Sequence, residues 1–174
     1  MNRQADPKIR YAVAALMLGA AGTIDLLNND AIARTADREQ RAEFRAGRSS
    51  ERAGLVEFSE GFQLTQGTLL VTSDSARLFR NEAGELERIE LTGDPVNWTE
   101  ELDDGSALVA KAQHIDYRMS AQEATLTGSA SVKKAGDEMR AETIHYDLAT
   151  QKLDAGGNSD EPVLFIYNPP GKKD

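Results

Sequence analysis

Two stretches of this chain repeat each other with a period of 29 residues. The matched positions are apolar residues on mostly alternate positions, while the residues between them vary. They are Ala112, Ile115, Tyr117 and Met119 in the first stretch and Ala141, Ile144, Tyr146 and Leu148 in the second. A repeat that keeps a period-2 apolar pattern predicts a repeated strand–turn–strand unit. Such units stack into a continuous sheet with one apolar face.

Composition excludes several classes of protein. The chain has 174 residues, about one domain, with 29 acidic and 20 basic residues and a formal net charge of −9. A strongly acidic chain is a poor candidate for binding nucleic acid, because phosphate contacts need clustered Lys and Arg. It is also a poor candidate for electrostatic binding to a membrane surface. There is no cysteine, which excludes a disulfide scaffold and thiolate metal sites.

The N-terminus has the pattern of a secretory signal peptide. Basic residues at positions 3, 8 and 10 precede an uncharged apolar run over residues 11–24, which is short for a membrane span. The segment Ala31-Ile-Ala33 is a candidate cleavage site. Cleavage nearer Gly22, an uncleaved anchor and a buried helix are the alternatives. We therefore expect a signal peptide over 1–33, one domain over 34–168 and a disordered tail over 169–174.

The rest of the chain alternates apolar and polar residues in short runs separated by turn signals, without a 3.6-residue period. This predicts an all-β protein of a dozen or more short antiparallel strands, each with one buried and one wet face. We expect an edge strand around Phe44, a turn or loop over 48–54, and a break at 92–95. The sequence Asp103-Asp-Gly105 is a strong hairpin signal.

Three phrases of the sequence occur together in a known family. They are Phe62-Gln-Leu-Thr-Gln-Gly-Thr-Leu-Leu-Val-Thr-Ser-Asp74, Leu91-Thr-Gly-Asp-Pro-Val-Asn-Trp98, and the block from Ala112 to Val132 that begins again at Ala141. In this order and spacing they resemble the OstA-like family of Gram-negative bacteria, over about residues 37–157. The resemblance implies a twisted, V-shaped β-jellyroll of antiparallel strands with an apolar groove open at both ends.

The resemblance also implies a function. Members of the family carry lipopolysaccharide through the periplasm and shelter its acyl chains inside the V. They stack head to tail into a bridge between the inner and outer membranes. The implied partners are lipopolysaccharide, further copies of the chain, an LptC-like protein at the inner membrane and the N-terminal domain of an LptD-like protein at the outer membrane.

The lipid-facing positions of the family match five residues here, and alternation alone places four of them on the apolar face. These residues are Ala42, Phe44, Trp98, Tyr117 and Met119. An inward aromatic residue in a jellyroll is also an ordinary core residue, so both interpretations stay open. The family's first strand is normally preceded by Asp-x-x-Gln-Pro-Ile, which here reads Asp37-Arg-Glu-Gln-Arg-Ala42 without the proline and isoleucine. This change affects the expected geometry of the groove at its N-terminal opening.

The last predicted strand, Val163-Leu-Phe-Ile-Tyr167, is apolar on both faces and ends before Pro169. It is either a covered core strand or a docking strand for the next copy, with Val163, Phe165 and Tyr167 at the partner edge. An unpaired strand edge is a template on which another chain can add a strand.

The sequence contains little that supports catalysis, and we expect no cofactor, metal site or catalytic residue. His114 and His145 are isolated on the polar face, and no nucleophile motif or phosphate loop is present. Three alternatives to a lipopolysaccharide carrier are a membrane-anchored LptC-like protein, a structural repeat protein, and a polysaccharide-acting enzyme that would use acids such as Glu101 or Asp103.

Overall fold

The structure is a computed structural model that describes residues 37, 40–148, 150, 152–157 and 162–169. The expected signal peptide and residues 170–174 of the expected tail lie outside the described residues. Every element whose bounds fall within the described residues is a strand, and all pairings between these strands are antiparallel. The strands are β1 (Glu43–Arg52), β2 (Leu55–Gln66), β3 (Leu69–Ser73), β4 (Ser75–Arg80), β5 (Leu86–Glu101), β6 (Ala107–Arg118), β7 (Glu123–Lys134), β8 (Asp137–Asp147), β9 (Lys152–Gly156) and β10 (Leu164–Ile166).

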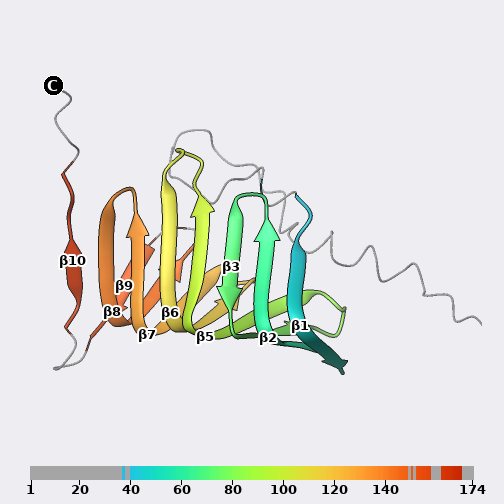
Figure 1. The fold of residues 1–174 in the computed structure, drawn as a ribbon. Coiled ribbons are helices and arrows are strands. Elements are labelled where there is room, and N and C mark those ends of the chain that lie inside the picture. The colour runs from blue at the N-terminus through green and yellow to red at the C-terminus, as the bar shows by residue number, and fades with distance from the viewer. Residues whose placement is uncertain (1–36, 38–39, 149, 151, 158–161, 170–174) are drawn as a thin grey trace, which may run out of the picture.

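The long strands bend and contribute to two layers of one continuous sheet. The first layer, upright in Figure 1, has the order β1-β2-β3-β5-β6-β7-β8-β10. The other halves of the long strands form the second layer, in which β4 takes the place of β3 and β9 takes the place of β10. The all-β antiparallel prediction is confirmed. The strands are fewer and longer than expected, because each predicted pair of short strands is one strand that turns a corner.

The corners lie where the antiparallel register shifts. Shifts occur in β1 near Gly47, in β5 between Thr92 and Val96, and in β7 between Thr127 and Ala130. A bulge of this kind bends a strand without ending it. The backbones approach closely here: a Cβ added to Gly128, whose φ is 82°, would lie 2.9 Å from the Cβ atom of Gln113. Glycine is therefore required at this corner.

Two local predictions are wrong for this reason. Residues 92–95 were expected to break the chain into two strands, but β5 continues through them as a bulge. The residue between β3 and β4 holds the bulge in place, since the backbone N–H of Asp74 donates a hydrogen bond of 2.9 Å to Thr92 O. Residues 48–54 were expected to form a turn or loop. The strand β1 instead extends to Arg52, and only Ala53 and Gly54 have the positive φ of a turn.

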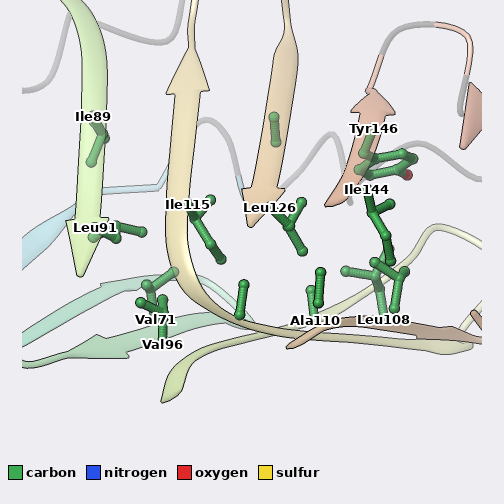
Figure 2. Close-up of a cluster of buried hydrophobic side chains, with 14 of the residues drawn as sticks. Val71, Ile89, Leu91, Val96, Leu108, Ala110, Ile115, Leu126, Ile144 and Tyr146 are labelled. Atoms are coloured by element: carbon green, nitrogen blue, oxygen red, sulfur yellow. The ribbon is translucent and has the colours of Figure 1, made fainter. Parts of the chain in front are cut away.

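The hydrophobic core lies between the two layers. Figure 2 shows Ile89, Leu91, Ile115, Leu126 and Ile144 of the second layer facing Val71, Val96, Leu108 and Ala110 of the first. The repeat supplies two of the largest fully buried side chains, Ile115 and Ile144, at equivalent positions. The alternating pattern of the sequence thus corresponds to the inner and outer faces of a two-layer sandwich.

The repeated unit is confirmed as strand–turn–strand: β6 and β7 form its first copy, and β8 and β9 its second. The copies differ after the corner. Strand β7 passes Gly128 and continues into the first layer, whereas β9 ends at Gly156. Beside β8, the corresponding place in the first layer is filled by β10, which pairs with Glu138, Met139 and Arg140.

Candidate functional site

Two aromatic residues from opposite layers meet in the middle of the sandwich. Trp98 lies on the first-layer half of β5, and Tyr117 lies on the second-layer half of β6. Their ring centroids are 6.1 Å apart, with an interplanar angle of 80°. This is the edge-to-face arrangement that aromatic pairs favour. Both side chains are partly buried and pack against the core. The pair therefore connects the two layers.

A small apolar cavity of about 20 Å³ lies beside Trp98. Because about 10–15 Å³ holds one water molecule, the cavity is too small for an acyl chain. The open groove expected from the resemblance therefore stays a prediction, since the interior is filled by side chains. Both layers contribute to the lining, which consists of Trp98, Glu100, Leu108, Ala110, Ile115, Ala124, Leu126, Val132, Tyr146 and Leu148.

Of the residues that line the cavity, only Trp98 was among the predicted lipid contacts, although the sequence contained a signal for two others. Tyr146 and Leu148 are the partners of Tyr117 and Met119 in the 29-residue repeat. A position that faces the interior in one copy of a β repeat also faces it in the other. Met119 itself follows β6, where its backbone N–H donates to Glu87 O at 2.9 Å. Its side chain packs against the core but is not among those that line the cavity.

The indole N–H of Trp98 has an unusual environment. The atom Nε1 is buried and has no hydrogen-bond acceptor among the described residues. Buried polar groups in folded proteins are nearly always paired, so an unpaired one requires a physical explanation. The inner-facing positions of β5 change character at this point, from Val96 at the corner to the carboxylate of Glu100. Trp98 therefore lies between a buried apolar residue and a buried carboxylate on the inner face of β5.

Phe44 lies at the N-terminal end of the sandwich, in a group of three phenylalanine residues. Its ring stacks on Phe58 at a centroid distance of 6.2 Å and an angle of 14°, and it contacts Phe62 at 6.3 Å. Phe58 and Phe62 are 5.3 Å apart. Ala42 precedes β1 and is partly buried against the core. The five predicted contacts thus divide between the phenylalanine end and the Trp98–Tyr117 region.

The segment before β1 is attached to the tip of the β2–β3 hairpin. The Asp37 carboxylate accepts a hydrogen bond of 2.9 Å from Thr68 N, and the Thr68 hydroxyl and the Gln40 amide also donate to it. Gln66 Nε2 donates to Gln40 O at 2.9 Å. Asp37 and Gln40 of the altered family phrase therefore make specific contacts, and they position the start of β1 beside the β2–β3 hairpin.

The C-terminal strand differs from its prediction in length and in burial. It is shorter, since β10 spans only Leu164–Ile166, and Val163 and Tyr167 lie outside it. A covered core strand is wrong, because Phe165 is 57% exposed and Tyr167 is 61% exposed. One edge of β10 pairs with β8 of the same chain. Whether β10 docks on another copy stays a prediction.

The outer face of the second layer is charged and internally paired. Arg88 forms an ion pair with Glu90 at 2.6 Å and a two-pronged one with Asp116, while Arg77 contacts Glu57 at 3.3 Å. The hydrogen bond and charge of Asp116 raise the pKa of the Arg88 guanidinium. The charged groups of this surface are therefore paired within the chain.

No feature of a catalytic site is assembled on the polar faces of the described chain. His114 and His145 are exposed, and each ring forms a hydrogen bond with a threonine hydroxyl, at 3.2 and 3.1 Å. At the β5–β6 turn, hydrogen bonds from Ser106 lower the pKa of the Asp104 carboxyl. Within the described residues, no group of three or more His, Cys, Asp or Glu could hold a metal ion. That part of the chain also contains no helix long and apolar enough to cross a membrane.

Comparison with known proteins agrees with this architecture. A family model described as "LptA/(LptD N-terminal domain) LPS transport protein" matches residues 47–152. The lipopolysaccharide export system protein LptA of Haemophilus influenzae is 28% identical over 117 residues, which are 66% of this chain and 68% of the relative. LptA of Escherichia coli K12 is 24% identical over 166 residues, with 93% of this chain and 89% of the relative covered.

A solved structure has the same fold. It is the crystal structure of LptH from Pseudomonas aeruginosa, described as the LptA homologous periplasmic component of the lipopolysaccharide transport device. It superposes with a TM-score of 0.69 at 21% identity, over 77% of this chain and 99% of the LptH chain. The predicted β-jellyroll is thereby confirmed.

Proposed function

Because this chain belongs to the LptA/(LptD N-terminal domain) LPS transport protein family, we propose that it is a periplasmic carrier of lipopolysaccharide. The observation that supports this proposal most directly is the aromatic pair Trp98–Tyr117, which joins two layers at an apolar cavity. The acyl chains of the lipid would lie between the layers, and the sugars and phosphates would stay in water. The relatives are named as export proteins, which agrees with a carrier rather than an enzyme.

Binding in this place requires the layers to move apart, since a cavity of about 20 Å³ does not hold an acyl chain. Burial of acyl chains stabilises the complex by about 0.8 kcal/mol per methylene. This gain is available to offset the separation of packed side chains. A carrier must also release its ligand, and an interior that closes again after release is suited to that task.

We expect the carrier to be exported by the segment 1–33 and cleaved after Ala33, with residues 34–168 as the functional domain and 169–174 as a disordered tail. N-terminal sequencing of protein purified from the periplasm tests the cleavage. A protein that begins at Met1 and sediments with the inner membrane would instead favour the LptC-like alternative.

We further propose that copies of the chain stack head to tail and bridge an LptC-like inner-membrane partner to the N-terminal domain of an LptD-like outer-membrane partner. The support is the exposed apolar C-terminal end, where the outer edges of β9 and β10 pair with no other described strand. Strand addition there would leave the interiors of successive copies in line.

Site-specific photo-crosslinking in cells tests lipid binding. A photoreactive residue at position 98 or 117 should capture lipopolysaccharide, because both positions face the space between the layers. Arg118 is the matched control, since it is next to Tyr117 on β6 but its side chain is 65% exposed on the outer face. We expect clearly less capture at 118 than at 117. Equal capture at 117 and 118 would contradict the proposed orientation.

A further inference from the structure

We infer that the indole N–H of Trp98 is a hydrogen-bond donor for the carbonyl group with which a bound acyl chain begins. The inference rests on the proposed function and assigns one atom a role in it. Its starting point is that Nε1 is buried without an acceptor among the described residues. Leaving a donor in this state is unfavourable, whereas phenylalanine would fill a similar place without an unpaired polar atom.

The position of Trp98 along β5 matches the chemistry of an acyl lipid. On the corner side lies Val96, which is fully buried, and on the other side lies Glu100, a buried carboxylate that also lines the cavity. An ester- or amide-linked chain has the same order, with hydrocarbon first, then a carbonyl, then the polar headgroup. A chain inserted toward the corner would therefore place its carbonyl near the depth of Trp98.

The carbonyl is suited to this donor in a second respect. A tryptophan N–H can only donate, so its partner must be an acceptor. An acyl carbonyl is an acceptor that carries no charge, and it enters an apolar space at a lower desolvation cost than a phosphate or a carboxylate. The phosphates of an amphiphile would remain in water, where the acidic chain does not attract them.

The test replaces Trp98 with benzothienylalanine, in which sulfur takes the place of the N–H group while the two fused rings remain. The replacement is made by suppression of a stop codon at position 98, and protein with tryptophan introduced there by the same suppression is the control. Equilibrium binding of radiolabelled lipopolysaccharide to immobilised protein should be about 5- to 10-fold weaker for the variant. The melting temperature of the ligand-free variant should be unchanged or higher, because an unpaired donor has been removed.

The inference predicts weaker lipid binding without a loss of stability, and this combination distinguishes it from a structural role of the N–H group. If the N–H group instead bonds within the protein, for example with the ring of Tyr117, the variant loses stability, and this outcome overturns the inference. Unchanged affinity for lipopolysaccharide also overturns it, while leaving the proposed function intact. Failure of the control protein to bind lipopolysaccharide contradicts the proposed function itself.

A spectroscopic measurement on the unmodified protein gives a second readout. Trp98 is the only tryptophan of the chain, so the indole region of a proton–nitrogen correlation spectrum contains a single signal. Lipopolysaccharide should move its proton resonance downfield, the direction expected for a new hydrogen bond. A resonance that stays in place at saturating lipid would contradict the proposed bond.

Discussion

The unpaired edges at the two ends of the sandwich differ in the strands that form them and in the side chains that they carry. At the N-terminal end, one long strand, β1, borders both layers and carries ion pairs such as Arg48–Glu60 at 3.1 Å. At the C-terminal end, the border is formed by two short strands, β9 and β10, from different parts of the chain. Charged side chains on an edge discourage pairing with another chain, whereas exposed apolar ones favour it.

The packing inside the two ends differs in the same direction. Phe44, Phe58 and Phe62 fill the N-terminal end with mutual ring contacts. Near the C-terminus, Phe165 and Tyr167 are more than half exposed, and Val163 and Leu164 are 44% and 47% exposed. The comparison indicates that the N-terminal end packs its aromatic residues against one another, while the C-terminal end keeps apolar surface available for a partner.

The largest expected effect comes from a matched pair of substitutions. Phe62→Ala should lower the free energy of unfolding by about 3–5 kcal/mol, because the side chain is 3% exposed and contacts both other phenylalanine rings. Phe165→Ala, at the other end, should change it by no more than about 0.5 kcal/mol. Urea denaturation followed by circular dichroism measures both values, and equal losses would remove the proposed difference between the ends.

A smaller effect is expected at the attachment of the N-terminal segment. Asp37→Ala should lower the free energy of unfolding by about 1–3 kcal/mol, because Thr68 N and the Thr68 hydroxyl lose their acceptor. Glu82→Ala, at an exposed position between β4 and β5, is the control and should have no measurable effect. If the two variants are equally stable in thermal melts, the Asp37 contacts do not stabilise the segment before β1.

The smallest effect on stability, but a complete effect on assembly, is expected from deletion of residues 161–174. Only three residue pairs link β10 to β8, so the melting temperature should fall by no more than about 4 °C. Full-length protein should form filaments of graded size as its concentration rises, because a head-to-tail contact does not close. The truncated protein should stay monomeric in light scattering and still bind lipopolysaccharide. Filaments that persist without residues 161–174 would exclude β10 as the docking strand.

Much of the fold was predictable because each strand has one wet and one buried face. Alternation and the 29-residue repeat identified the all-β class, and the Asp-Gly signal at 104–105 identified the hairpin between β5 and β6. The prediction at 92–95 was wrong because glycine and proline signal a chain break and a sheet corner equally well, and the one at 48–54 was wrong because the polar residues 48–52 belong to the edge strand β1. Only the neighbouring strands show that the ladder resumes beyond the bulge.

The candidate site was predictable only in part. The sequence placed Trp98 and Tyr117 on apolar faces, and the repeat could also have indicated Tyr146 and Leu148. It contained no information on which faces oppose each other, since period-2 alternation is the same for every strand. The contact between Trp98 and Tyr117, the small size of the cavity and the unpaired Nε1 atom all depend on how the two layers close.

The sequence by itself determined the class of the fold, the two faces of each strand and the apolar character of the C-terminal segment. The tertiary structure decided where the strands turn, that Asp37 attaches to Thr68 across 31 residues, and that β10 is exposed on β8 rather than buried. The physical reason is the range of the interactions. Alternation reflects burial one residue at a time, while corners, edges and cavities arise from contacts between residues far apart in the chain.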